Sequence, residues 1–252
     1  YVSGSAGARK TALAVATGTG TELALTVDGA KGQILQASGF LDIKVYGFVA
    51  VQGNLAVSKT SETVVLAKRA GQATGDSVAA DVLTIGGSSI DVFVGANGGT
   101  SDAIGLELND IDFGLALITS KLQPTRKWTA LTATASSVGL VGLSDLLPTV
   151  RNLSVELNQA SIAMDQVVDF SARNLNVKTG TSTSVNLNFN GATGELLRAE
   201  GDVTLQISDF AYFKGRIGFE KYSPTNAIKL NNSLNSFQTT IPPSPTTSML
   251  AM

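Results

Sequence analysis

The sequence predicts an all-β protein with an elongated repeat architecture, built either like a β-solenoid or as a stacked β-sandwich. Three observations support this prediction. Hydrophobic and polar residues alternate with a period of two along most of the chain, no segment keeps a 3.6-residue period over 12 residues, and one long β-type segment occurs twice. Between them, these observations favour strands over helices and repeated units over a single closed core.

The alternation is clearest in four stretches. It runs through "TELALTV" (21–27), "FLDIKVYGFVAV" (40–51), "SVNLNFN" (184–190) and "DVTLQISDF" (202–210). In the third stretch Val185, Leu187 and Phe189 share one face while asparagines occupy the other. A register shift of one residue would bury the asparagines, so we expect the pairing of this strand to be well specified.

The internal repeat relates residues 13–59 to residues 175–221, an offset of 162 residues. The two segments align without a gap over 47 positions, of which 16 are identical. Glycines recur at equivalent positions, including Gly29 with Gly191 and Gly53 with Gly215. Apolar residues exchange for other apolar residues at Leu41/Val203, Ile43/Leu205 and Leu55/Ile217, as expected where turns and core packing constrain a repeated β unit.

Three shorter segments between the two copies share a plan of strand, corner and strand. They are "LTIGGSSIDVFVG" (83–95), "LELNDIDFGLAL" (106–117) and "LTATASSVGLVGL" (131–143). Each places small or polar residues between two apolar runs. Such units suit stacked solenoid coils or the arches of a sandwich. The solenoid is favoured because residues that could anchor equivalent units recur about every 32 residues on average, close to the length of a solenoid repeat. These residues are Phe48, Ile90, Phe113, Leu146, Leu175 and Phe210.

The predicted organisation is a repetitive β domain over 1–237 and an extended tail rich in Pro, Ser and Thr over 238–252. The tail either packs on its own domain or inserts into a neighbouring subunit as an added strand. The second alternative makes four residues candidate interface residues: Ile241, Pro242, Pro243 and Pro245.

Composition excludes several classes of protein. The chain has 252 residues, no His and no Cys, so disulfides, thiolate or imidazole metal sites and His-dependent nucleophiles are ruled out. Its net charge of −2 argues against a nucleic-acid binder. No apolar run reaches the roughly 18 residues that a transmembrane helix needs, so we expect no transmembrane segment.

We expect the protein to need no cofactor. Calcium is the one possible cofactor for which the sequence offers candidate ligands. The candidate ligands are Asn97, Asp102, Asp110 and Asp112, since Ca²⁺ prefers oxygen ligands. The segment "GANGGTSD" lacks the dense acidic spacing of a calcium loop, so solvated or corner-capping carboxylates are the alternative. The only tryptophan, Trp128, follows Arg126 and Lys127. It either binds a sugar or a membrane headgroup or, as is commoner, is a strand-start residue that packs on a loop.

Three phrases resemble repeats of very large secreted or surface-exposed bacterial proteins, some of them adhesin-like. They are "LTIGGSSIDVFVGANG", "AIGLELNDIDFGLALI" and "GDVTLQISDFAYFKGRIGFEK". The resemblance implies an extracellular or cell-surface location and a structural or adhesive role. It carries over no catalytic residues, and the Asp-rich insertion that can precede "AIGL" in that group is reduced here.

The functional expectation is a non-enzymatic, extracellular structural protein that assembles head to tail into a filament or surface array. Its expected partners are copies of itself, because a chain whose two ends repeat one element can be continued by another copy. One alternative is an adhesin-type module that binds glycans or other cells. The other is a β-helical enzyme acting on polysaccharides, which the fold alone does not exclude.

Overall fold

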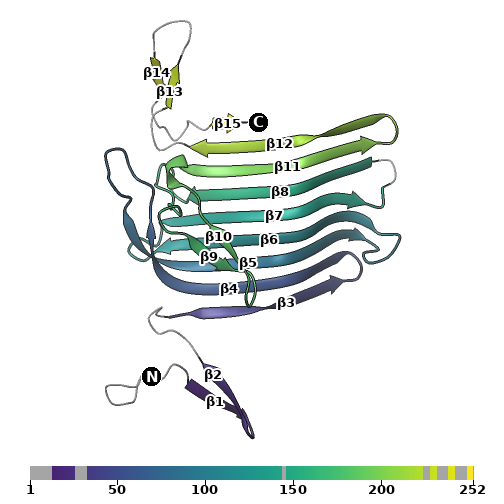
Figure 1. Ribbon diagram of the computed structural model, residues 1–252, viewed down its shortest axis with the longest axis horizontal. Helices are drawn as coiled ribbons and strands as arrows, with labels where there is room; N and C mark the ends of the chain where they lie inside the picture. The colour runs from purple at the N-terminus through teal and green to yellow at the C-terminus, as the bar shows by residue number, and fades with distance from the viewer. Residues whose placement is uncertain are drawn as a thin grey trace.

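The protein is an all-β chain organised around one large antiparallel sheet. The computed structural model describes residues 13–25, 33–143, 146–223, 228–231, 238–241 and 249–251. The large sheet contains nine strands in the order β15-β12-β11-β8-β7-β6-β5-β4-β3 (Figure 1). Its strands are β3 (Leu35–Val45), β4 (Val49–Val65), β5 (Ser77–Ala96), β6 (Ile104–Ser120), β7 (Lys127–Val141), β8 (Leu146–Ala160), β11 (Glu195–Ile207), β12 (Ala211–Ser223) and β15 (Met249–Ala251).

Three two-stranded hairpins accompany the sheet. They are β1 (Leu13–Gly18) with β2 (Thr21–Leu25), β9 (Leu175–Lys178) with β10 (Ser184–Leu187), and β13 (Ile228–Asn231) with β14 (Gln238–Ile241). The β9–β10 hairpin packs across the large sheet, mainly over β5, β6 and β7. No helix of membrane-spanning length and apolarity occurs in the described part of the chain.

The prediction of an all-β fold is confirmed, but the expected solenoid is wrong for the residues that the structure describes. From β3 to β8, each strand reverses direction and pairs antiparallel with the strand that precedes it. A solenoid requires the chain to turn at each corner and stack successive coils. Here the predicted corners are single-residue bulges inside strands of up to 20 residues, so the strands continue across the sheet.

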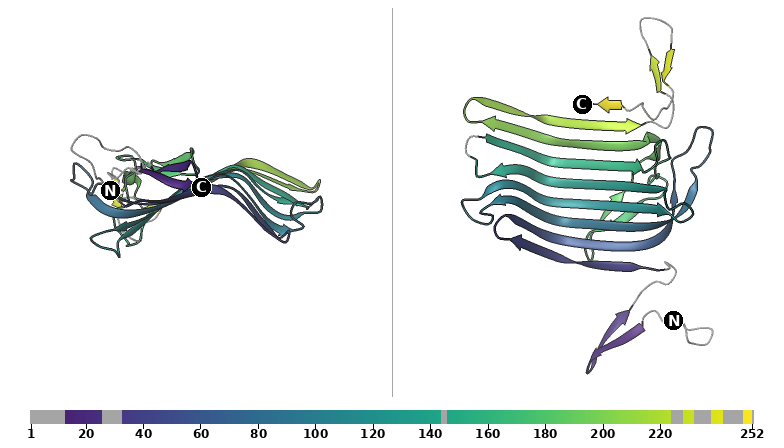
Figure 2. Two further views of the ribbon diagram at one scale, coloured as in Figure 1. Left: turned by 90° about the horizontal axis from the view of Figure 1, so that it is seen from below. Right: turned by 180° about the vertical axis from the view of Figure 1, so that it is seen from behind.

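The bulges line up across the sheet and form what we call the bulge belt: Ser89, Asp110, Ser136 and Asn152. Each residue is skipped in the pairing register of its strand. Ser89, Asp110 and Asn152 have φ values of 49°, 52° and 51°, in the left-handed region that Asn and Asp tolerate better than most residues. Seen edge-on, the strands curve as one layer (Figure 2), as aligned bulges would cause.

The two copies of the repeated segment fold alike. Leu35 pairs with Lys59 between β3 and β4, and the equivalent residues Leu197 and Lys221 pair between β11 and β12. The turns match as well: Phe48 N–H donates to Val45 O and Phe210 N–H donates to Ile207 O. Along the sequence, the β1–β2 hairpin precedes β3 as the β9–β10 hairpin precedes β11. One structural module therefore occurs at both ends of the sheet.

The core lies on the face of the sheet under the β9–β10 hairpin, which we call the hairpin face. Val82, Ile118 and Trp128 point to this face and are buried against Val177 and Leu187 of the hairpin. The segments that flank the hairpin add further side chains, among them Val168, Phe170 and Phe189, with the two phenylalanine rings 5.9 Å apart in an edge-to-face contact. Trp128, 1% exposed, is a core residue, so the interpretation of it as a surface ligand-binding residue is wrong.

Beside the core, Arg126 and Asp165 form a two-bond ion pair. Arg126 Nη2 donates to Asp165 Oδ1 at 2.6 Å, and the side chains are 18% and 10% exposed. Burial raises the pKa of Asp165, but the bonds from Arg126 and from Gln166 N–H outweigh it and hold the pKa below the ordinary value of 3.8. The stability that this pair supplies is therefore present above the unfolded-state pKa and is lost as pH falls through the lowered folded-state pKa.

We expect Asp165→Asn to lower the free energy of unfolding by about 1–3 kcal/mol at pH 7, because it weakens charge-assisted bonds to Arg126. The gap between variant and wild type should stay constant from neutral pH down to about pH 5 and shrink as pH falls below about 4. Urea unfolding across this pH range measures it. The control is Asp42→Asn, whose carboxylate pairs with Lys44 on the surface; a gap for Asp165→Asn that widens with acidity would contradict the assignment.

Candidate functional site: an open sheet face, two edges and a groove

The second face of the large sheet, which we call the open face, carries continuous rows of apolar residues. Directly paired residues of neighbouring strands point to the same face, and alternate residues along a strand share it. One row crosses six strands on the side of the sheet nearer the core: Val57, Ile85, Leu115, Leu131, Leu157 and Leu197. A second row crosses the same strands beyond the bulge belt: Val51, Val92, Leu108, Val138, Val150 and Val203.

Both rows lie on one face because each bulge inserts an extra residue. On β6 the open-face residues are odd-numbered before the belt, as in Leu115, and even-numbered beyond it, as in Leu108. On β11, which keeps its pairing with β12 without a shift, Leu197 and Val203 are both odd-numbered. The bulge belt therefore keeps the apolar pattern in phase across strands of different length.

The open face is uncovered in the described structure. The hairpin that packs across the sheet lies on the hairpin face, where a Cβ on Gly86 would fall 2.2 Å from Lys178 O. Beyond the bulge belt the sheet is a single layer, seen clearly at the right of Figure 2, left. Large apolar side chains there are strongly exposed, with Val94 at 48% and Leu106 at 38%. Contiguous apolar surface of this kind marks an interaction site in most soluble proteins.

The two outer edges of the sheet are a second candidate. The outer edge of β3 has no partner strand among the described residues, and that of β12 pairs only with β15 at Glu220, Lys221 and Tyr222. In the equivalent positions, β11 pairs with β8 and β4 pairs with β5 along most of their lengths. Unpaired backbone donors and acceptors on long edge strands are templates for pairing with another chain.

The β1–β2 hairpin exposes residues that are buried in its repeat. Val177 and Leu187 are fully buried against the sheet, whereas the equivalent Val15 and Leu25 are 39% and 42% exposed. Leu13 and Leu23 are also exposed. An apolar face that the same fold covers in one copy and leaves bare in the other indicates a missing neighbour.

The four candidate calcium ligands are not brought together. Asn97 and Asp102 lie in the turn after β5, where Asn97 Nδ2 donates to Asp102 O at 3.3 Å. Asp110 belongs to the bulge belt and Asp112 lies beside it. Asp110 is six residues along β6 from Ile104, so it is about 20 Å from the turn. Among the described residues no cluster of three or more acidic side chains could hold a metal ion.

The carboxylates in and beside the belt accept hydrogen bonds from neighbouring strands instead. Asp112 Oδ1 accepts from Ser89 N–H at 2.9 Å, and Asp91 Oδ1 accepts from Asp110 N–H at 2.9 Å. Asp110 Oδ2 accepts from Ser136 Oγ at 2.8 Å. Sequence reasoning missed Asp91 because a bulge register cannot be read from one strand. Its carboxylate also accepts from Gln52 Nε2, so it links β4 and β6.

We expect Asp112→Ala to destabilise the protein by about 1–3 kcal/mol, because it removes the acceptor of the Ser89 N–H group in a strained bulge. Asp112→Asn keeps an oxygen acceptor and should lose less. Thermal unfolding by circular dichroism compares the two variants. Equal losses for Ala and Asn would show that the charge of Asp112, and not the bond, matters.

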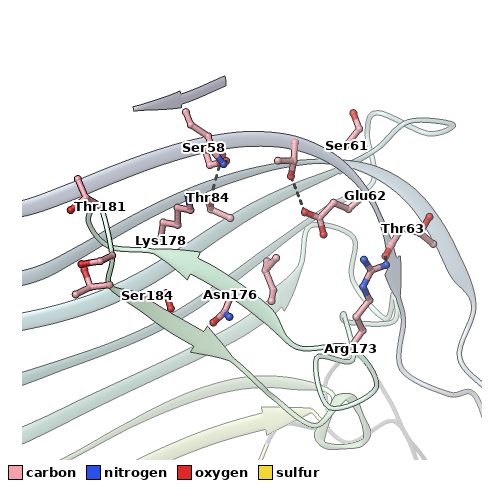
Figure 3. Close-up of a pocket in the computed structure, with 15 residues that line it drawn as sticks. Ser58, Ser61, Glu62, Thr63, Thr84, Arg173, Asn176, Lys178, Thr181 and Ser184 are labelled. Carbon is pink, nitrogen blue, oxygen red and sulfur yellow. Dashed lines mark hydrogen bonds between the residues drawn. The ribbon is translucent and has the colours of Figure 1, made fainter. Parts of the chain in front are cut away.

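A groove of about 690 Å³ opens between β4 and the β9–β10 hairpin (Figure 3). Its lining is dominated by hydroxyl groups, and it contains one carboxylate, Glu62, and two cations, Arg173 and Lys178. The serines and threonines that line it are Ser58, Thr60, Ser61, Thr63, Thr84, Thr181, Ser182, Thr183 and Ser184. Arg173 Nη1 donates to Thr63 O, which fixes one wall. Sequence reasoning did not single out this groove, because its two walls are more than 100 residues apart.

Of the four candidate interface residues in the tail, only Ile241 lies among the described residues. Ile241 ends β14 and pairs with Ile228 of β13. Pro242, Pro243 and Pro245 lie outside the described residues. Farther along, β15 pairs with β12 of its own sheet, so this part of the predicted extended tail is an added edge strand.

Comparisons with known protein families, with characterised proteins and with solved structures give no match to this chain. The functional argument therefore rests on the geometry of the sheet itself.

Proposed function

We propose that this chain is a structural repeat unit whose sheet is extended, edge to edge, by further copies into a filament or surface array. The observation that carries the proposal is the equivalence of β3–β4 with β11–β12. The outer edge of β3 has no partner among the described residues and that of β12 pairs only with the three-residue β15, whereas the equivalent edges of β11 and β4 pair with β8 and β5. The bare apolar face of the β1–β2 hairpin supports the same conclusion, because its counterpart lies on a sheet.

The strand directions allow this continuation. In the meander, β3 and β11 run the same way, so β12 of one copy and β3 of the next would pair antiparallel, like their neighbours. The resemblance of the repeats to those of large secreted bacterial proteins favours an extracellular or cell-surface setting. In this proposal the protein's role is mechanical and adhesive, and no catalytic step is assigned.

Cysteine cross-linking tests the edge junction, because the chain has no cysteine of its own. Lys44 on β3 and Lys214 on β12 are the two ends of one row of directly paired residues that crosses the sheet. Between them the row contains Ala50, Phe93, Glu107, Gly139, Thr149 and Thr204. If copies join in the same rows, Lys214 of one copy faces Lys44 of the next, at a Cα separation that a disulfide can bridge.

We expect the Lys44→Cys/Lys214→Cys double variant to give a ladder of covalent oligomers on oxidation, as resolved on a non-reducing gel. Each single variant can form dimers at most and serves as the control. Negative-stain electron microscopy of the wild-type chain should show filaments with a regular axial repeat as concentration rises. Single particles at every concentration, with no ladder beyond dimer, would overturn the proposal.

A second candidate function is binding of a neutral, polyhydroxylated ligand such as a glycan, in the manner of an adhesin module. The hydroxyl-lined groove favours it, since Ser, Thr, Arg and Glu side chains can exchange hydrogen bonds with sugar hydroxyls. It ranks second because no aromatic ring lines the groove to stack on a sugar. Stabilisation of the wild type by an oligosaccharide panel, lost in Arg173→Ala, would support it; no shift with any member would remove it.

A further inference from the structure

We infer that the open face is the inner face of a two-layer β-sandwich whose second layer is the open face of another copy of this chain. This inference stands apart from the edge junction, because it concerns a face and not an edge. It begins from the size of the apolar surface. From the row of Ile85 to the row of Val94 the face spans about 30 Å along the strands, and from β3 to β12 about 35 Å across them.

That area, about 1,000 Å², exceeds the roughly 800 Å² per partner that a standard stable protein interface buries. The rows hold branched and long aliphatic side chains, as the inner faces of sandwiches do. A partner that covers such a face must offer an equally broad, uncharged and pleated surface.

Charge distribution supports the same occupant. The charged residues of this face, Lys59, Asp81, Lys127, Glu195 and Lys221, lie toward the core end of the strands, and Lys221 ends the Leu197 row on β12. The hairpin face beyond the bulge belt, by contrast, carries Lys44, Glu107 and Lys214 in one row. The sheet is therefore amphipathic across its thickness. A second copy turned by a two-fold axis would present identical apolar rows and keep the charged rims in water.

A lipid surface is the other partner that an apolar face could take. Proteins seated at a membrane interface usually carry Trp, Tyr, Lys or Arg around the apolar surface. Here the single tryptophan is in the core and the Lys residues of the open face occupy one end only. We therefore assign the open face to a second copy of the chain, and the experiment below distinguishes this partner from a lipid surface.

The test uses neighbouring residues of β11 that point to opposite faces. Leu205 pairs with Phe213 on the open face, and Thr204 pairs with Lys214 on the other. Each is replaced by Lys in the full chain, so both variants gain the same charge at nearly the same place. Val94→Lys, at a site that is already 48% exposed, is a second open-face variant that should fold normally.

Sedimentation velocity over a concentration series should show wild-type and Thr204→Lys dimers, with at least tenfold weaker association for Leu205→Lys and Val94→Lys. Where filaments form, those of the wild type should be two sheets thick and those of Leu205→Lys one sheet thick. The cysteine ladder of the edge junction should persist in the Leu205→Lys background, which separates the two contacts.

Two outcomes would overturn the inference. One is equal association of Leu205→Lys and Thr204→Lys at every concentration. The other is a monomeric wild type that floats with phosphatidylcholine vesicles and loses flotation in Leu205→Lys, which would assign the face to lipid.

Discussion

Trp128→Ala should destabilise the protein by about 3–5 kcal/mol, the largest loss that we expect from a single truncation. The indole is the largest fully buried side chain of the core, and its Nε1–H donates to Gln166 O at 2.7 Å. The variant opens a cavity between the sheet and the segment after β8, and it leaves a buried carbonyl without that donor. Both effects act in the same direction.

The measurement is urea unfolding followed by circular dichroism, since the variant lacks the only tryptophan and its fluorescence. Trp128→Phe keeps most of the volume without the N–H donor and should fall between the variant and the wild type. Leu122→Ala, at a residue that is 87% exposed, is the control and should change little. A Trp128→Ala protein as stable as wild type would mean that the indole is not packed as described.

Gly86→Ala should lift the β9–β10 hairpin from the sheet. A Cβ on Gly86 would lie 2.2 Å from Lys178 O and 3.0 Å from a methyl of Val177. The clash involves hairpin backbone, which no side-chain rotation relieves, so the hairpin must move. We expect a loss of about 1–3 kcal/mol, with exposure of apolar residues that the hairpin now buries, Val177 and Leu187 among them.

Hydrogen exchange distinguishes this local effect from general destabilisation. Protection should fall first in residues 175–187, while the central strands of the large sheet keep theirs. Gly39→Ala is the matched control, because Gly39 is also a strand glycine and no atom lies within 4 Å of its added Cβ. It should be neutral or slightly stabilising. Unchanged protection of the hairpin in Gly86→Ala would contradict the close contact between Gly86 and the backbone of Lys178.

The sequence was informative about strands because alternation and burial coincide here. The run "SVNLNFN" placed Val185 and Leu187 on one face, and Leu187 is buried in the core. The internal repeat was equally readable: turns and inward positions tolerate few substitutions, so they preserved the alignment of β3–β4 with β11–β12. The site was predictable only in part, since Asp110 and Asp112 were recognised as special but assigned to a metal and not to a bulge.

Solenoid corners and β-bulges have similar amino-acid sequences. "GGSSID", "LNDID" and "ASSVG" each interrupt an apolar run with small or polar residues, which suits a solenoid corner as well as a bulge. What decides between them is the partner strand, because Ser89 and Asp110 are held by carboxylates from β6 and β5 respectively. Such cross-strand bonds join residues about 20 apart and leave no local signal.

By itself, the sequence determined that this protein is built from strands, that its pattern recurs after 162 residues and that its chemistry excludes thiol and imidazole sites. Those properties follow from residue type and from spacing along one strand. Only the tertiary structure decided that the strands form one curved sheet, that one hairpin covers its core side and that no described residue covers the other side. These depend on register between strands, which is set by packing energies summed over many distant pairs.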